Sequence, residues 1–246
     1  GISRAVMRLT KLEQFYIANA PITDEFFVEV AEDSAFYAER DTWSWAEFEN
    51  LQDMEIYNCA QLTKLPLDLL CGAPKLQSLN LSMNQGIAGK QLLSDWEAII
   101  CGASGADIQI LYFNSCNLEE TPDYSHLSRM TKLGLLDLSN NKLRKIHPFG
   151  KEIYPTTLYY DNNRIESIAP SEDGYFCGLG QLETFSCSNN QLTELPDLFD
   201  ARSVHSMITA NFSGNKISTL TNGDQWRGLN TETLNLADNH FSELPA

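Results

Sequence analysis

Apolar residues recur along this chain in a short spacing that is repeated from end to end. The clearest copy has apolar residues at Leu133, Leu136, Leu138 and Leu143, and Asn141 stands between the last two. The two middle leucines alternate with other residues at period two, which is typical of a short strand that buries one face. A strand this short cannot fold alone, so the pattern predicts that copies of it pair with one another.

Nine copies of the spacing can be aligned, and together they fill the chain. In chain order, the asparagine position of the nine copies is occupied by Ala20, Cys59, Asn84, Cys116, Asn141, Asn163, Asn190, Asn215 and Asn239. The intervals between these positions run from 22 to 39 residues, which indicates a solenoid of stacked repeats. The first copy is weak, and Pro155 and Thr231 replace the opening leucine of the sixth and ninth copies.

The segments between the copies predict the outer face of the stack. Residues 90–100 carry apolar side chains at a helical spacing, and the long interval at 24–51 has room for one or two helices. A further helix over 2–9 is predicted to cap the first repeat. Elsewhere a proline such as Pro196 follows the closing leucine, and a proline there prevents the sheet from continuing.

The spacing resembles that of the leucine-rich-repeat family over essentially the full length. The resemblance implies an α/β solenoid, an arc with a concave parallel sheet of about nine short strands and a convex face of loops and short helices. We expect a single domain over 1–246, with an N-terminal cap and irregular first repeat in 1–50 and regular repeats in 51–246. The last repeat lacks a polar cap, so we expect either more chain or a partner at that end.

Strand residues that point away from the core would form the surface that a partner meets. Counting from the apolar positions places four tyrosines and five acids on the outward positions, and no Lys or Arg falls there. The predicted partner-binding residues are Tyr16, Tyr57, Tyr112, Tyr159, Glu55, Asp137 and Asp161. Tyrosine offers a large contact area with a polar tip, which is typical of binding hot spots. The acids and the absence of Lys and Arg predict a neutral or basic partner. The alternative is that tyrosine simply suits strands.

The overall charge narrows the choice of partner. Asp and Glu number 33 against 17 Lys and Arg, which gives a net charge of −16. Such a field repels phosphate backbones and anionic headgroups, so nucleic acid and membrane surfaces are not expected partners, although acidity also serves solubility. No run of 18 apolar residues and no signal-like start is present, so no membrane insertion is expected within this chain.

The sequence does not point to catalysis or to a cofactor. Cys59 and Cys116 occupy the asparagine position and Cys187 a strand core position, so we expect free thiols that act as small fillers. No two cysteines have C-x-x-C spacing and the four histidines are scattered, so no metal site is expected. The S-x-x-K spacings at 139–142 and 213–216 belong to the repeat pattern, and no catalytic residue is predicted.

These observations favour a non-catalytic binding module that recognises a protein or peptide, or alternatively a glycan, on its concave face. A second hypothesis is a structural spacer or assembly element that uses its ends or its convex side, and an enzyme is not expected. The family resemblance further implies a bacterial protein at the cell surface or secreted from the cell, an expectation that rests on analogy.

Overall fold

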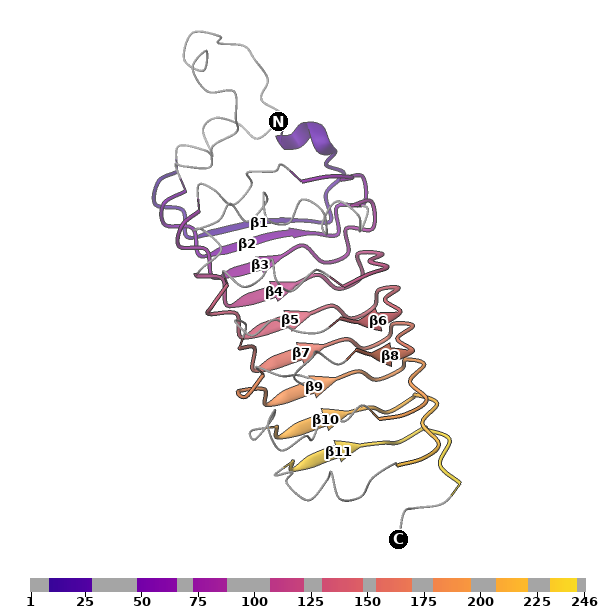
Figure 1. The fold of residues 1–246 in the computed structure, drawn as a ribbon. Coiled ribbons are helices and arrows are strands. Elements are labelled where there is room, and N and C mark those ends of the chain that lie inside the picture. Colours follow the sequence, from indigo (N-terminus) through magenta and orange to yellow (C-terminus); the bar gives the residue numbers. More distant parts are fainter. Residues whose placement is uncertain are drawn as a thin grey trace.

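Nine short parallel strands form one sheet in which neighbours follow one another in chain order (Figure 1). The computed structural model describes residues 9–27, 48–65, 73–87, 107–121, 130–147, 154–169, 179–195, 207–220 and 231–242. The strands are β1 (Gln14–Ala18), β2 (Asp53–Tyr57), β3 (Ser78–Asn80), β4 (Ile110–Tyr112), β5 (Leu135–Asp137), β7 (Thr157–Tyr159), β9 (Thr184–Ser186), β10 (Thr209–Asn211) and β11 (Thr233–Asn235). The predicted parallel sheet, with one strand from each copy, is confirmed.

The strands are stacked so that equivalent positions of the repeats are neighbours. Leu111 of β4 pairs with Leu136 of β5, which in turn pairs with Leu158 of β7, and all three side chains are buried. Each buried leucine contributes about 1.5–3 kcal/mol by leaving water. Farther along, the ring centroids of Phe185 and Phe212 lie 5.6 Å apart. The inward residues of successive repeats therefore merge into one continuous core.

An asparagine ladder closes the turn after each strand in most of the repeats. Asn190 is typical, because its Oδ1 accepts a hydrogen bond from the Ile165 backbone N–H of the preceding repeat at 2.9 Å. Its Nδ2 donates to the Tyr160 carbonyl of that repeat at 3.0 Å and to the Ser188 carbonyl of its own repeat at 3.0 Å. Each such amide joins two repeats and satisfies backbone groups that the turn would leave buried and unpaired.

The residue before the ladder position has a left-handed backbone in all nine repeats. The residues concerned are Asn19, Asn58, Met83, Ser115, Asn140, Asn162, Asn189, Gly214 and Asp238, with φ between 51° and 67°. Asparagine tolerates this conformation better than most residues, which explains why five of the nine are asparagine. Two of these amides also join neighbours, since Asn58 Nδ2 donates to Asn19 Oδ1 at 2.7 Å and Asn189 Nδ2 donates to Asn162 Oδ1 at 3.0 Å.

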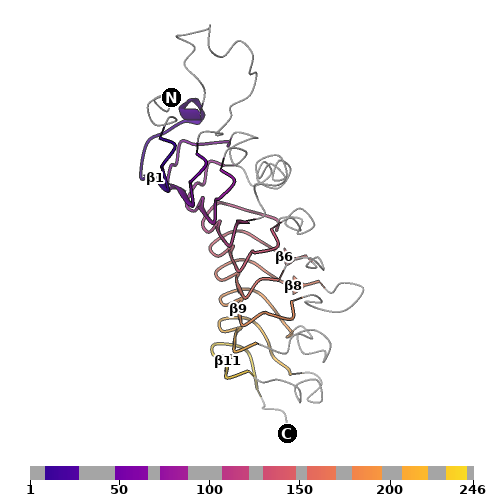
Figure 2. The same cartoon turned by 90° about the vertical axis from the view of Figure 1, so that its left-hand side faces the viewer.

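A second, two-stranded parallel sheet lies beyond the carboxyl ends of the main strands. It consists of β6 (Lys145–Ile146) and β8 (Ser167–Ile168), and the apolar spacing did not predict it. Figure 2 shows the long sheet along one side of the stack and β6 and β8 toward the other. Backbone hydrogen bonds thus join the repeats on both sides of the core.

Most of the predicted convex helices lie outside the described residues. The helix predicted over 90–100 is wholly outside them, as is the helix predicted over 2–9 except for Leu9, which is not helical. Within the interval 24–51 the structure describes one short 3-10 helix, η1 (Asp24–Phe27). The Asp24 carboxylate accepts hydrogen bonds from the backbone N–H groups of Thr63 and Lys64 at 2.7 and 2.9 Å, so it ties the first repeat to the second.

Burial decreases at the last strand. The side chain of Leu234 in β11 is 37% exposed, whereas the equivalent Leu136 in the middle of the sheet is 1% exposed. Asn239 still completes the ladder, accepting from the Ile217 backbone N–H at 3.0 Å. The ninth repeat therefore keeps the fold of the others despite the missing opening leucine.

Candidate functional site

The predicted recognition residues lie on the outward face of the nine-stranded sheet, here called the concave face. The pairing places Tyr16 beside Glu55, and it places Asp137 between Tyr112 and Tyr159. The central row of outward residues is Tyr16, Glu55, Asn80, Tyr112, Asp137, Tyr159, Ser186, Asn211 and Asn235. The structure thus brings five of the seven predicted residues into one row.

The other two predicted residues lie in the next outward row, two positions later along each strand. Tyr57 ends β2 and pairs with Ala18, and Asp161 follows β7. The phenol of Tyr57 donates a hydrogen bond to Met83 Sδ at 2.8 Å, which holds the ring over the third repeat. Tyr57 therefore lies to one side of the Tyr112–Tyr159 pair rather than between these two rings.

All four tyrosines are accessible from the concave face. Tyr16 is 53% exposed, and Tyr57, Tyr112 and Tyr159 are each half-buried. Desolvation, followed by the nearby charges of Asp53 and Glu55, raises the pKa of the Tyr16 phenol. The phenol therefore stays protonated and able to donate a hydrogen bond at neutral pH.

The carboxylates of Asp137 and Asp161 are held in place by neighbouring groups. Asp137 Oδ1 accepts the Ser139 backbone N–H at 2.9 Å, and its Oδ2 accepts from Asn114 Nδ2 at 3.1 Å. Asp161 Oδ1 accepts three hydrogen bonds, from the Ser186 hydroxyl at 2.6 Å, the Ser188 hydroxyl at 2.7 Å and the Ser188 backbone N–H at 2.6 Å. Asp137 keeps more of its accepting capacity for a partner, because a carboxylate offers about four lone-pair sites.

Several outward residues are buried, which sequence register alone did not reveal. Ser82, Ser139, Ser186 and Ser188 point outward but are between 1% and 8% exposed. Ser186, for example, lies between Tyr159 and Asn211 of the two paired strands, both of which have larger side chains. Register predicts the direction of a side chain, whereas its exposure depends on the sizes of the residues beside it. These serines therefore face outward but are too buried to contact a partner.

The described cysteines are buried free thiols, as their register predicts. They are Cys59, Cys116 and Cys187. Burial raises the pKa of the Cys116 thiol to about 11 and that of Cys187 well above its usual range. Cys116 Sγ donates to the Leu81 carbonyl at 3.2 Å, as an asparagine amide does in other repeats. These thiols therefore serve as ladder and core residues, since only a thiolate reacts readily.

The described parts of the chain carry neither a candidate metal site nor a candidate membrane span. No group of three or more His, Cys, Asp and Glu side chains there could hold a metal ion. Across these same segments, no helix has the length and apolar character needed to cross a membrane.

Stacked in-register strands, a buried leucine core and an asparagine ladder define a parallel-strand repeat solenoid. The sequence model described as Leucine Rich Repeat matches residues 181–201, which include the whole of β9. With this match and the fold together, the chain belongs to the leucine-rich-repeat family.

Two solved structures show the same architecture over nearly the whole chain, and a curated relative is similar in sequence over part of it. A leucine-rich repeat protein from Bacteroides eggerthii DSM 20697 is 36% identical with a TM-score of 0.76, and the match covers 99% of this chain and 41% of that one. One from Bacteroides thetaiotaomicron VPI-5482 is 37% identical with a TM-score of 0.75, over 96% of this chain and 29% of that one. Lumican from Bos taurus is 23% identical over 188 residues, which are 70% of this chain and 54% of lumican. The chain thus spans about half or less of each of these relatives.

Proposed function

We propose that this chain is a non-catalytic recognition module that binds a protein or peptide through its concave face. The observation that carries the proposal is the row in which Asp137 lies between Tyr112 and Tyr159 on three adjacent strands. Adjacent strands are spaced by about 4.8 Å, so the two tyrosines lie about 10 Å apart with a carboxylate between them.

This arrangement suits a basic side chain of the partner. A Lys or Arg of the partner that binds over Asp137 lies within reach of both rings and of the carboxylate, which combines cation–π attraction with a charge-assisted hydrogen bond. Asp137 is already fixed by Ser139 and Asn114, so little conformational freedom is lost on binding. Tyr16 and Glu55 repeat the pairing of an aromatic ring with a carboxylate at the first two strands.

The charge of the face supports the same choice of partner. Its outward positions, all of which lie in described residues, hold Asp53, Glu55, Asp137, Asp161 and Asp238 but no Lys or Arg. A neutral or basic partner is attracted by such a surface, and nucleic acid is repelled. A glycan that stacks on the tyrosines is a variant of the proposal.

The cellular context is part of the proposal. Similarity to two Bacteroides proteins over nearly the whole chain supports a bacterial source, and we propose the cell surface or the extracellular space as its location. The competing hypothesis is a spacer or assembly element whose contacts lie at its ends or on its convex side. It predicts that the concave tyrosines are dispensable for binding.

A displayed random-peptide library selected on the purified chain tests the proposal. We expect the selected peptides to be enriched in Lys and Arg, and we expect the triple variant Tyr57→Ala, Tyr112→Ala, Tyr159→Ala to lose at least about tenfold in affinity for them, as expected when hot-spot residues are truncated. Tyr154→Ala is the matched control, because Tyr154 is 46% exposed but precedes its strand and lies outside both outward rows.

Two further measurements make the outcome decisive. The melting temperature of the triple variant is compared with that of the wild-type chain, since Tyr57 also contacts Met83. Asp137→Asn keeps the shape but removes the charge, and we expect it to weaken basic peptides more than neutral ones. Unchanged affinity in a folded triple variant would refute the proposal and favour the spacer.

A further inference from the structure

A cluster of cations lies beyond the carboxyl ends of β4, β5 and β7, on a different surface from the concave face. Its side chains, Lys142, Arg144, Lys145, His147 and Arg164, together with Glu119 and Glu120, line a surface hollow of about 340 Å³. We call this set the basic flank. Four of the chain's 17 Lys and Arg residues gather here, although the net charge of the chain is −16. The positive charge of the basic flank is thus opposite in sign to the charge of the concave face.

The backbone that carries the basic flank is fixed from repeat to repeat. The Lys142 N–H donates to the Leu118 carbonyl at 2.7 Å, and the Arg164 N–H donates to the Leu143 carbonyl at 2.9 Å. Lys145 belongs to β6, which pairs with β8, and the Glu166 N–H donates to the Arg144 carbonyl at 3.0 Å. The backbone that carries the cations is therefore held by hydrogen bonds between repeats, which lowers the entropy lost when they arrange around a ligand.

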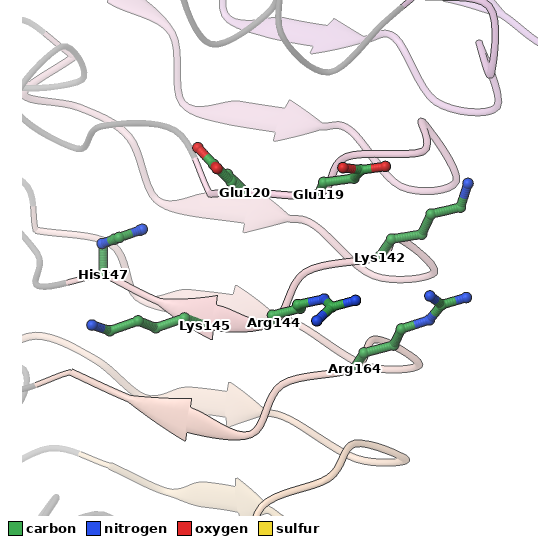
Figure 3. Close-up of a pocket in the computed structure, with 7 residues that line it drawn as sticks. All are labelled: Glu119, Glu120, Lys142, Arg144, Lys145, His147 and Arg164. Atoms are coloured by element: carbon green, nitrogen blue, oxygen red, sulfur yellow. The ribbon is translucent and has the colours of Figure 1, made fainter.

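Buried residues alternate with the cations and set their direction. Leu143 and Ile146 point into the core and are fully buried, whereas Arg144 and Lys145 between them are exposed. Figure 3 shows Lys142, Arg144 and Arg164 extending to the same side from neighbouring turns, with Glu119 across from them. Lys145 and His147 lie toward the other end of the hollow.

The cations of the basic flank are not neutralised by the surrounding described residues. The ion pair found within the described residues is that of Lys132 with Asp107, which is elsewhere. Glu119 and Glu120 line the same hollow but form no ion pair with these cations in this part of the chain. The hollow therefore presents at least four positive charges and two separate negative ones.

We infer that the basic flank is a second binding site, which takes carboxylate side chains of an acidic peptide segment. Guanidinium groups bind carboxylates through paired hydrogen bonds, and Arg144 and Arg164 come from adjacent repeats, so they can hold successive acidic groups. The two glutamates and the net charge of −16 disfavour a dense polyanion or a doubly charged phosphate, and they are tolerated by a singly charged carboxylate. This inference does not depend on the concave face.

The test uses a fluorescent synthetic peptide of glutamate and glycine, titrated with the whole chain at about 0.1 M salt. The Debye length is then about 10 Å, so distant charges contribute little. We expect saturable binding that is absent for the same peptide with glutamine in place of glutamate. The double variant Arg144→Gln, Arg164→Gln is expected to weaken binding at least about tenfold, as expected when two charge-assisted contacts are removed.

A charge-matched control separates a local site from general attraction. The double variant Lys11→Gln, Lys75→Gln removes the same charge from the first and third repeats, and we expect less than about a twofold change because those lysines lie at least two repeats from Arg144 and Arg164. Tyr112→Ala is expected to leave this affinity unchanged, which distinguishes the basic flank from the concave face. Charge reversal, Arg144→Glu with Arg164→Glu, is expected to abolish saturable binding of the glutamate peptide.

Three results would overturn the inference. The first is no saturable binding of the glutamate peptide by the wild-type chain. The second is an equal loss in the two charge-matched double variants, which would indicate non-specific attraction. The third is stronger competition by inorganic phosphate than by free glutamate peptide, which would indicate an anion site of another class. Matching circular dichroism spectra and melting temperatures confirm that each variant is folded.

Discussion

The asparagine ladder gives a quantitative prediction at Asn141, in the middle of the stack. Its Oδ1 accepts hydrogen bonds from the backbone N–H groups of Cys116 at 2.9 Å and Leu118 at 3.0 Å. Its Nδ2 donates to the carbonyls of Phe113 and Leu138, both at 2.9 Å. Asn141→Ala removes all of these contacts at a position that is 8% exposed.

The size of the effect follows from which backbone groups lose a partner. The Leu138 carbonyl keeps a hydrogen bond from Asn163 Nδ2 at 3.0 Å, so it stays satisfied. Three groups, namely the N–H groups of Cys116 and Leu118 and the Phe113 carbonyl, lose the contact with Asn141. An unsatisfied buried backbone group costs about 1–3 kcal/mol, and the slight exposure of this site favours the low end. We therefore expect a loss of about 3 kcal/mol in the free energy of unfolding.

Cysteine at the same position provides a graded comparison. Cys116 shows how a thiol fills this slot, donating to the Leu81 carbonyl of the preceding repeat at 3.2 Å. Asn141→Cys should restore donation to Phe113 but accept the two N–H groups only weakly, so we expect a loss of about 2 kcal/mol, smaller than that of alanine. Gln109→Ala, at an exposed position in the preceding repeat, is the control and should change stability by less than about 0.5 kcal/mol.

Urea unfolding followed by far-UV circular dichroism measures these differences, and amide hydrogen exchange locates them. In Asn141→Ala the amides of Cys116 and Leu118 should exchange faster, whereas the Ile165 amide, bound by Asn190, should not. A loss below about 1 kcal/mol, or equal acceleration at Ile165, would show that the ladder asparagines do not hold neighbouring repeats together pair by pair.

Two further changes probe the backbone and the pH dependence. Gly214→Ala should destabilise the chain by more than about 1 kcal/mol, because φ is +67° and the new Cβ would press on the Asn189 side chain. The control is Gly180→Ala, where the added Cβ meets open space, and it should lose less than about 1 kcal/mol in the same urea assay. The second change concerns Asp24, where desolvation is outweighed by hydrogen bonds from Thr63 and Lys64 and by the charge of Lys64, so the pKa of its carboxyl group is lowered from its usual value. The contribution of the Asp24 carboxylate to the free energy of unfolding should be complete above the unfolded pKa and disappear as pH falls through the folded pKa. The urea midpoints of wild type and Asp24→Asn should therefore differ at pH 7 and converge toward pH 2. A difference in midpoint that stays constant with pH would contradict this.

The strands and their register were predictable because two independent sequence signals agree. Period-two alternation of residues such as Leu136 and Leu138 gives direction, and the amide at Asn141 marks the turn. The same agreement correctly placed Tyr112, Asp137 and Tyr159 in one outward row. Whether these residues bind a partner is a separate prediction, because a row is a geometric consequence of the fold and binding is not.

The left-handed residues that precede the ladder positions have a sequence signal of their own. Asn140, Asn162 and Asn189 each precede a ladder asparagine, and consecutive asparagines are a signal for a left-handed residue at the first of them. By contrast, β6 and β8 could not be predicted from apolar spacing. Lys145–Ile146 and Ser167–Ile168 offer one buried residue each, and their pairing depends on how two adjacent repeats stack.

The basic flank could not be predicted from the sequence either, and the same three repeats that carry it also carry part of the concave face. Its residues are separated in sequence, from Glu119 to Arg164, and only the stacking of three turns brings them together. Those turns directly follow β4, β5 and β7, the strands that carry Tyr112, Asp137 and Tyr159. One partner with a basic segment and an acidic segment could therefore engage both surfaces at once. In that case the second contact would form at a high effective concentration, and variants of the two surfaces would show coupled losses of affinity. Two separate partners would instead give losses that each respond to one surface only, so a double-mutant comparison of Asp137→Asn with Arg144→Gln decides between a single bipolar partner and two.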